Sequence, residues 1–101
     1  MPEVVFLPAA AREASDAQDW YEREAPGFGV RFREELHRAV QRLADNPLQF
    51  PQVVAPMRRA LLRRFPYALY FGVVDDSVFV VACIHSSRDP LLWRNRGVGG
   101  S

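Results

Sequence analysis

The fold is decided by the stretch YALYFGVVDDSVFVVACIH, which spans residues 67–85. It contains two runs rich in β-branched and aromatic residues, Tyr67–Val74 and Ser77–Ser86, separated by Asp75-Asp76. β-Branched and aromatic side chains favour strands, and a polar pair between two apolar runs is typical of a tight hairpin turn. The stretch therefore predicts a β-hairpin.

The second strand of this hairpin carries apolar side chains on both of its faces. Successive side chains of a strand point to opposite faces of the sheet. This alternation predicts one face made of Val78, Val80, Ala82 and Ile84, and another made of Phe79, Val81, Cys83 and His85. A strand that is covered on both faces lies inside a sheet, so we expect this strand to be central.

Two arginine pairs occupy the run Arg58–Phe65, which we predict to be the strand before the hairpin. Alternation along one strand places Arg58 and Arg64 on one face, and Arg59 and Arg63 on the other. Arginine donates a planar fork to carboxylate or phosphate, so such a strand suits an acidic protein segment or a nucleic acid. Charges on an edge strand also serve simply to block aggregation, and the residues alone leave these alternatives open.

Two helices are predicted before these strands, after a short strand at residues 3–7. The first helix begins at Pro8 and ends near Glu24, and the second begins near Phe28 and ends at Asp45. Their apolar faces consist of Ala10, Ala14, Ala17 and Tyr21 in the first helix, and of Phe28, Phe32, Leu36, Val40 and Leu43 in the second. The turn between them is short, which predicts an antiparallel helical hairpin.

The remaining segments complete the predicted fold. Residues 47–56 contain three prolines, which predicts an ordered connection without regular structure. Asp89-Pro90 is typical of a helix start and predicts a short helix up to Arg96, followed by a flexible glycine-rich tail at residues 97–101. The order β-α-α-β-β-β predicts a single α+β domain over residues 1–96, with a two-helix hairpin packed on a mostly antiparallel sheet.

Length and composition limit the class of protein. A chain of 101 residues that is 49% hydrophobic and 25% charged is typical of one globular domain. The longest apolar run, Val78–Ile84, is shorter than the roughly 20 residues that a membrane helix needs, and the N-terminus lacks a signal-peptide pattern. A single cysteine excludes an internal disulfide, and no Cys/His cluster is present for a metal. We expect a cytoplasmic protein without a metal or cofactor.

Charge is distributed unevenly along the chain. All 13 basic residues are arginines, so no lysine is available as a general base or Schiff-base amine. Residues 1–50 carry six arginines and nine acidic residues, whereas residues 51–101 carry seven arginines and three aspartates, which suits an anionic partner. The acidic residues of the first helix spread around its polar side and predict only a solvated face: Glu13, Asp16, Asp19, Glu22 and Glu24.

Few residues qualify for catalysis. A nucleophilic site needs a serine or cysteine beside a histidine, and the chain has only His37 and His85. We expect His37 to lie on the polar side of the second helix, and Cys83 to be a buried, unreactive side chain within a strand. His85 ends a strand before Ser86-Ser87-Arg88, where a capping role and a ligand-binding role are both open.

A set of short patterns runs along nearly the whole chain. These are Trp20-Tyr21, Gly27 to Phe32, Pro47, Pro51, Arg63, Phe65-Pro66-Tyr67, Tyr70, His85, Arg88-Asp89-Pro90, Trp93 and Arg96. Their order, spacing and element types resemble the RelE/ParE family of bacterial toxins, although no single pattern is diagnostic. The resemblance implies a toxin of a type II toxin–antitoxin system, encoded beside an antitoxin that wraps and neutralises it. The family's fold has the element order predicted above.

The resemblance implies one of two activities. RelE-like members cleave messenger RNA on the ribosome with lysines and arginines, or with Glu, His and Arg; here His85 and Arg64 are the candidates for that chemistry. ParE-like members poison DNA gyrase and perform no catalysis of their own. The Arg-Phe-Pro-Tyr run at residues 64–67 and the ending from Arg88 to Arg96 resemble the ParE branch more closely. We therefore expect a gyrase poison, with an mRNA endonuclease as the alternative.

The resemblance also implies two binding surfaces. We expect target contact through Arg88, Trp93, Arg94 and Arg96, although Trp93 alternatively packs back on the sheet. We expect a ParD-like antitoxin to cover the helical hairpin and the sheet edge, contacting Arg58, Arg59, Arg63 and Tyr21. Neither a membrane nor a specific nucleic-acid sequence is an expected partner. An inactive relative that only binds its antitoxin is a third hypothesis, and growth arrest on expression without antitoxin distinguishes it.

Overall fold

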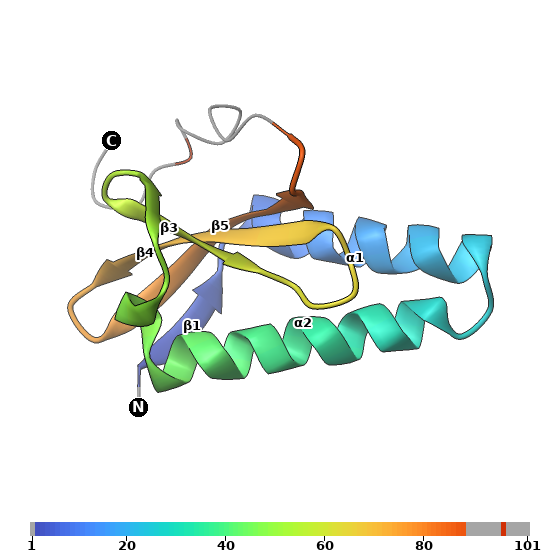
Figure 1. The fold of residues 1–101 in the computed structure, drawn as a ribbon, viewed down its shortest axis with the longest axis horizontal. Helices are drawn as coiled ribbons and strands as arrows, with labels where there is room; N and C mark the ends of the chain where they lie inside the picture. Colours follow the sequence, from blue (N-terminus) through green and yellow to red (C-terminus); the bar gives the residue numbers. More distant parts are fainter. Residues whose placement is uncertain (1, 89–95, 97–101) are drawn as a thin grey trace.

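Two helices pack on one face of a five-stranded sheet (Figure 1). The structure, a computed structural model, describes residues 2–88 and residue 96. Its elements are β1 (Glu3–Phe6), α1 (Pro8–Glu24), α2 (Phe28–Asp45), the 3₁₀ turn η1 (Pro47–Gln49), β2 (Gln52–Val54), β3 (Met57–Leu61), β4 (Tyr67–Val74) and β5 (Ser77–His85). The expected α+β fold and helical hairpin are confirmed. None of the helices in the described part of the chain is long and apolar enough to cross a membrane.

The sheet has the strand order β1-β5-β4-β3-β2. β5 lies between β1 and β4, so its predicted central place is confirmed. β1 pairs with β5 in parallel, and the other three strand pairs are antiparallel. The connection predicted to lack regular structure contains η1 and the three-residue strand β2, so that prediction was wrong. β2 forms because its backbone pairs with β3, a long-range contact that local proline content does not report.

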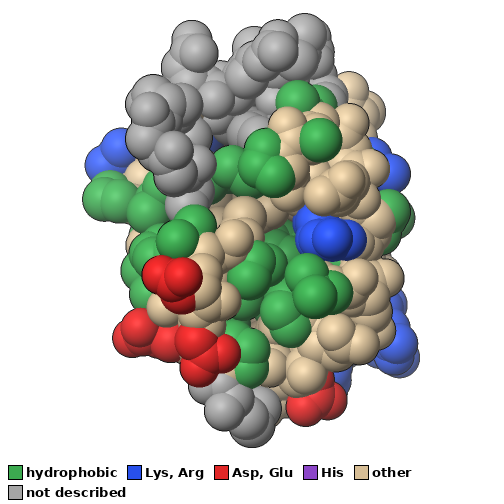
Figure 2. Space-filling view, turned by 90° about the vertical axis from the view of Figure 1, so that its left-hand side faces the viewer, with side chains coloured by type: hydrophobic (Ala, Val, Ile, Leu, Met, Phe, Trp, Pro, Cys, Tyr) green, Lys and Arg blue, Asp and Glu red, His purple; other side chains and the backbone are tan. Residues whose placement is uncertain are grey.

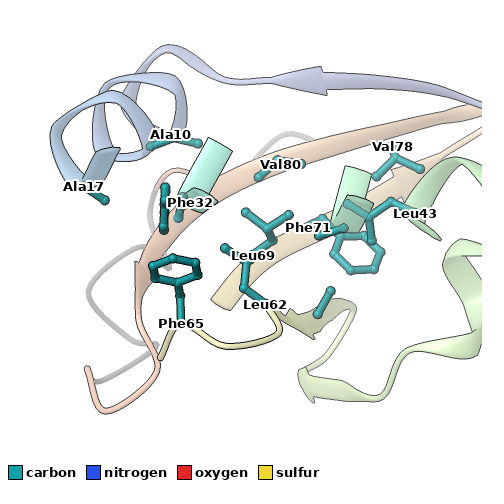
Figure 3. Packing of buried hydrophobic residues seen from close by; sticks show 14 residues of the cluster. Ala10, Ala17, Phe32, Leu43, Leu62, Phe65, Leu69, Phe71, Val78 and Val80 are labelled. Atoms are coloured by element: carbon teal, nitrogen blue, oxygen red, sulfur yellow. The ribbon is translucent and has the colours of Figure 1, made fainter. Parts of the chain in front are cut away.

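The main core lies between the helices and the sheet (Figure 3). Small residues of α1 allow close approach to the sheet, and larger side chains of α2 fill the space beside it. The buried cluster includes Ala10, Ala14 and Ala17 from α1, Phe32, Ala39 and Leu43 from α2, and Leu69, Phe71, Val78, Val80 and Cys83 from the hairpin strands. The apolar face predicted for the first helix is confirmed.

The face of α2 that points into the core differs from the predicted stripe. Phe28 is 40% exposed, because the first turn of α2 belongs to the hairpin tip, which projects beyond the sheet (Figure 1). Glu35 is buried, with only 5% exposed, although it lies outside the predicted apolar stripe. Its carboxylate is 3.3 Å from the guanidinium of Arg38 and 3.7 Å from that of Arg64. These partners make burial of the charge tolerable.

A β-bulge at Val81 overturns the predicted alternation of β5. Tyr70 pairs with Ala82 and Phe71 with Val80, so Val81 is the extra residue. Val78 and Val80 face the helices, whereas beyond the bulge Cys83 does so and the second apolar cluster contains Val81, Ala82 and Ile84. One inserted residue exchanges the two faces of a strand, because the side-chain period of a strand is two.

The arginine-rich strand is shorter than predicted. β3 ends at Leu61, and the chain turns back to β4 through a residue in the left-handed region, Arg64, with φ 69°. Arg63 and Arg64 therefore lie in a turn, where strand alternation does not apply. Both line grooves shared with α2, so the prediction that they occupy opposite faces of a strand was wrong.

Apolar side chains are exposed at both ends of the molecule. At the end opposite the hairpin tip, hydrophobic side chains are exposed between acidic and arginine side chains (Figure 2). At the tip, Trp20 and Val30 are about as exposed as Phe28. The predicted short helix at residues 89–96 and tail at 97–101 lie outside the described residues, apart from Arg96.

Candidate functional site

The edge of β5 beyond β1 is closed by two side chains instead of a strand. The last backbone hydrogen bond between the β1 segment and β5 joins the Leu7 N–H to the Val80 carbonyl, at 2.9 Å. Further along β5, the Glu13 carboxylate accepts from the Cys83 N–H at 3.1 Å, and the Arg96 guanidinium donates to the carbonyl of the bulge residue at 3.1 Å. These side chains satisfy backbone groups that an open strand edge leaves unpaired.

Arg96 and Glu13 are also paired with each other. The two guanidinium nitrogens of Arg96 donate to Oε1 and Oε2 of Glu13 at 2.9 and 3.0 Å, which is a two-bond fork. The pair is part-buried, and hydrogen bonds between charged groups are among the stronger ones in proteins. The described end of the predicted target-binding segment is thus held against the sheet, while Trp93 and Arg94 lie outside the described residues.

His85 is bound within the turn that follows β5. Its Nδ1 accepts from the Ser87 backbone N–H at 3.1 Å and lies 2.7 Å from the Ser87 hydroxyl. Because Nδ1 accepts a backbone hydrogen bond, a neutral imidazole carries its proton on Nε2. The Arg88 N–H donates to the His85 carbonyl at 2.9 Å, which tightens the same turn. This geometry is the capping arrangement considered for His85.

A cleft of ≈ 270 Å³ lies beside this turn. Trp20, Tyr67, His85 and Arg88 are among the residues that line it. The Tyr67 and His85 rings meet edge to face, with centroids 5.7 Å apart. Burial raises the pKa of the Tyr67 hydroxyl, nearby Cys83 raises it further, and Arg88 lowers it. Tyr67 therefore stays protonated at neutral pH and is a hydrogen-bond donor rather than a base.

Cys83 is buried, as predicted, and its thiol is unreactive. Burial, with the nearby Glu13 carboxylate, raises the pKa of the thiol to about 12. The thiolate is the nucleophilic form of cysteine, so a thiol with this pKa attacks nothing at neutral pH. The arrangement excludes Cys83 as a nucleophile.

The two candidates for nuclease chemistry lie in different places. His85 lines the cleft beside α1, whereas Arg64 lines a groove of α2 together with Glu35 and Phe65. The lining of the cleft does not include Arg64, and the lining of this groove of α2 does not include His85. The structure does not bring this pair together as a general acid and an electrostatic stabiliser, which must act on the same phosphate.

The candidates for antitoxin contact differ in their burial and in their hydrogen bonds. Arg58 donates to the Phe50 carbonyl at 2.6 Å and to the Leu48 carbonyl at 3.4 Å, so it holds the connection after α2. Arg59 is half-buried, and Arg63 is exposed beside α2. Tyr21 is half-buried among aromatic rings of Trp20, Phe32, Phe65 and Tyr67. Burial raises the pKa of the Tyr21 hydroxyl.

Comparison with known proteins identifies the family that has this architecture. Residues 4–90 match the model of a family described as the ParE toxin of the type II toxin–antitoxin system parDE. The chain belongs to the ParE toxin family. A chain of the chromosomal ParDE system from P. aeruginosa has the same fold, with a TM-score of 0.74 and 19% sequence identity over 84% of this chain and 96% of that one. A search of curated proteins found no match.

Three acidic residues of this ParE-family toxin have roles that the sequence analysis missed. Glu13 closes the β5 edge, and Glu35 is the buried partner of two arginines. Glu22 accepts from the N–H groups of Gly27 and Gly29 at the start of α2, at distances from 3.0 to 3.2 Å. Glu13 and Glu22 were expected on a solvated face, and Glu35 lies outside the predicted apolar stripe. The Gly-x-Gly at residues 27–29 was the one local signal for the role of Glu22. A helix that starts with glycines has no side-chain cap of its own, so its first N–H groups need an acceptor from elsewhere.

Proposed function

We propose that this toxin arrests growth by poisoning DNA gyrase in the cytoplasm and that a ParD-like antitoxin neutralises it. The observation that carries the proposal is the match of residues 4–90 to the ParE family, which covers most of the chain. Two features of the site support a toxin without catalysis of its own. His85 is engaged in a turn, and Arg64 lies in another groove.

We place gyrase contact in the segment that begins at Arg88, with Trp93 and Arg94 as the contacting residues. Arginines around an aromatic side chain have the composition of a binding hot spot. Arg96 was a candidate for the same contact, and its fork with Glu13 makes it suited to holding the segment instead. The support is the anchored position of Arg96 at the bulged part of β5.

We place the antitoxin on the hairpin tip and along the arginine side of α2. Trp20, Phe28 and Val30 are large apolar residues left exposed at the tip, and the Tyr21 aromatic cluster lies beside them. An amphipathic helix that covered them would bury this surface. Arg59 and Arg63 remain available for acidic residues of the same partner, whereas Arg58 is engaged with the connection after α2.

The test is a gyrase cleavage assay with the antitoxin-free toxin. Supercoiled plasmid is incubated with gyrase and toxin, denatured and digested with protease, and linear DNA is measured. We expect toxin-dependent linear DNA from the wild type and from His85→Ala, and a strong loss from Arg88→Gln/Arg94→Gln, which leaves Arg96 in place. Growth arrest without linear DNA, abolished by His85→Ala in a folded protein, would instead support ribosome-dependent mRNA cleavage.

A further inference from the structure

A groove runs along α2 on the side that faces the turn after β3. It has two parts, which share Arg38. The first part, of ≈ 610 Å³, is lined by Arg38, Arg42, Asp45 and Arg63 among others. The second part, of ≈ 550 Å³, lies toward the start of α2. We call the two parts together the α2 groove.

The first part of the α2 groove has an excess of positive charge. It contains three arginines and one carboxylate, that of Asp45. Arg42 donates to the Leu61 carbonyl at 3.3 Å, and among the described residues neither Arg42 nor Arg63 has an ion-pair partner. Burial lowers the pKa of Arg42, the neighbouring Arg63 lowers it further, and Glu35 raises it. Arg42 and Arg63 line the same part of the groove, so an anion bound there would reduce the repulsion between the two like charges.

The second part of the α2 groove has a smaller excess of positive charge, with three arginines and two glutamates, and is partly aromatic. Glu35 lies within ion-pair distance of Arg38 and Arg64, so it neutralises part of the arginine charge. The rings of Phe28 and Phe65 line the same part. Such a surface suits contacts with apolar groups more than contacts with charged groups. A ligand that fits both parts is acidic at one end and apolar at the other.

The turn that supplies arginines to the α2 groove is strained. Arg64 has a φ of 69°, a conformation that is uncommon for a residue with a long side chain. It brings Arg63 into the first part of the groove and Arg64 into the second, although the two are neighbours in sequence. Backbone strain of this kind persists where surrounding structure enforces it and is found preferentially at functional sites.

We propose that the α2 groove binds an acidic segment of a protein partner, with its carboxylates between Arg42 and Arg63. An acidic peptide segment is favoured over a nucleic-acid backbone because Phe28 and Phe65 line the second part of the groove and suit apolar side chains, which a peptide supplies and a phosphate backbone does not. A peptide can alternate acidic and apolar residues to match the two parts. That the partner is the antitoxin rests on the proposed function, whereas the preference for carboxylates rests on the groove alone.

The test uses fluorescein-labelled hexaglutamate as the probe, at low ionic strength, with fluorescence anisotropy as the readout. We expect wild-type toxin to bind it, and Arg42→Gln/Arg63→Gln to bind at least about tenfold more weakly, since two charge-assisted contacts are lost. The matched control is Arg12→Gln/Arg23→Gln on α1, which removes the same charge from exposed positions and should change binding less than about twofold. Arg63→Gln alone removes no described hydrogen bond, so weaker binding by this variant would not be explained by misfolding.

Each outcome decides the proposal. Equal weakening by the two double variants would overturn it, because binding would then follow net charge rather than the groove. Tighter binding of an oligothymidylate of matched charge than of hexaglutamate would overturn it in favour of a nucleic acid. Absence of hexaglutamate binding to the folded wild type would also overturn the proposal. The gyrase assay is run on the same samples. Its failure with intact peptide binding removes the proposed function and leaves the acidic-segment site standing.

Discussion

Arg96 and Glu13 are 83 residues apart in sequence, yet the Arg96 guanidinium forms two hydrogen bonds of 2.9 and 3.0 Å with the Glu13 carboxylate. The same carboxylate accepts from the Cys83 N–H, and the same guanidinium donates to the Val81 carbonyl. One ion pair thus ties α1, the bulged part of β5 and the C-terminal segment together. It also shields a strand edge that would otherwise invite pairing with another chain.

The first prediction concerns this ion pair. Glu13→Gln keeps an acceptor for the Cys83 N–H and removes the charge that binds Arg96. Because the pair is part-exposed, we expect a loss of only about 1 kcal/mol in the free energy of unfolding. Hydrogen exchange at Arg96 should accelerate much more than that of β4. An unchanged exchange rate at Arg96 in Glu13→Gln would show that the pair does not hold this residue.

The second prediction concerns Gly29 in the first turn of α2. A Cβ added there would lie 2.9 Å from the Glu22 Cβ and 3.0 Å from the Gln18 carbonyl oxygen, and neither atom is the flexible end of a side chain. Alanine normally stabilises a helix by about 0.5–1 kcal/mol relative to glycine. Here we expect the cost of overpacking to exceed this gain. Gly29→Ala should lower the free energy of unfolding, measured with a denaturant, by about 1–2 kcal/mol.

Gly27 provides the comparison for Gly29. A Cβ at Gly27 meets no atom within 4 Å, but its φ of 91° is strained for most side chains. Gly27→Asn should therefore cost less than Gly27→Ala, because asparagine tolerates the left-handed region. If Gly29→Ala instead stabilised the protein, the two helices would have to separate more easily than their packing indicates.

The third prediction is an asymmetry between Glu35 and its two arginines. The Glu35 side chain is buried, whereas those of Arg38 and Arg64 are mostly exposed. Removing the arginines in Arg38→Gln/Arg64→Gln leaves a buried carboxylate without its two ion-pair partners, which we expect to cost about 2–4 kcal/mol. Glu35→Leu leaves only exposed cations, so it should change stability by less than about 1 kcal/mol. Denaturant unfolding of the two variants, with equal m-values, checks this order.

The fourth prediction concerns pH. Burial raises the pKa of the Cys83 thiol from its ordinary value of 9.0 to about 12. The folded protein therefore holds this proton more tightly than the unfolded chain, so the stabilisation is complete below pH 9 and is lost as the pH rises toward 12. The raised pKa values of Tyr21 and Tyr67 act in the same direction.

Cys83→Ala isolates the cysteine part of this dependence. It should reduce the fall in stability between pH 9 and 12 without abolishing it, because the tyrosines remain. In a separate measurement, iodoacetamide should alkylate Cys83 of the native wild type far more slowly than that of the urea-unfolded chain at pH 8. Equal rates in both states would contradict the burial of the thiol.

Local chemistry was sufficient for the two helices and their hairpin, for the β4–β5 hairpin and for the central place of β5. The run of residues 67–85 contains its own turn and its own strand preference, and the apolar spacing of α1 matches the face that is buried. These features depend on residues close in sequence, which a propensity or a period reports directly. The resemblance to the toxin family followed from the same short patterns in order.

Only the tertiary structure decided the bulge at Val81, the turn at Arg64 and the partners of the acidic residues. A bulge changes the pairing register between two strands, here β4 and β5. The apolar alternation along the sequence of one strand does not reveal where that change occurs. Their sequence context predicts Glu13, Glu22 and Glu35 as surface residues, because each has at least one partner outside its own helix. A charge is recognised as structural only when its distant counterpart and its burial are both known, and those two quantities exist only once the chain has folded.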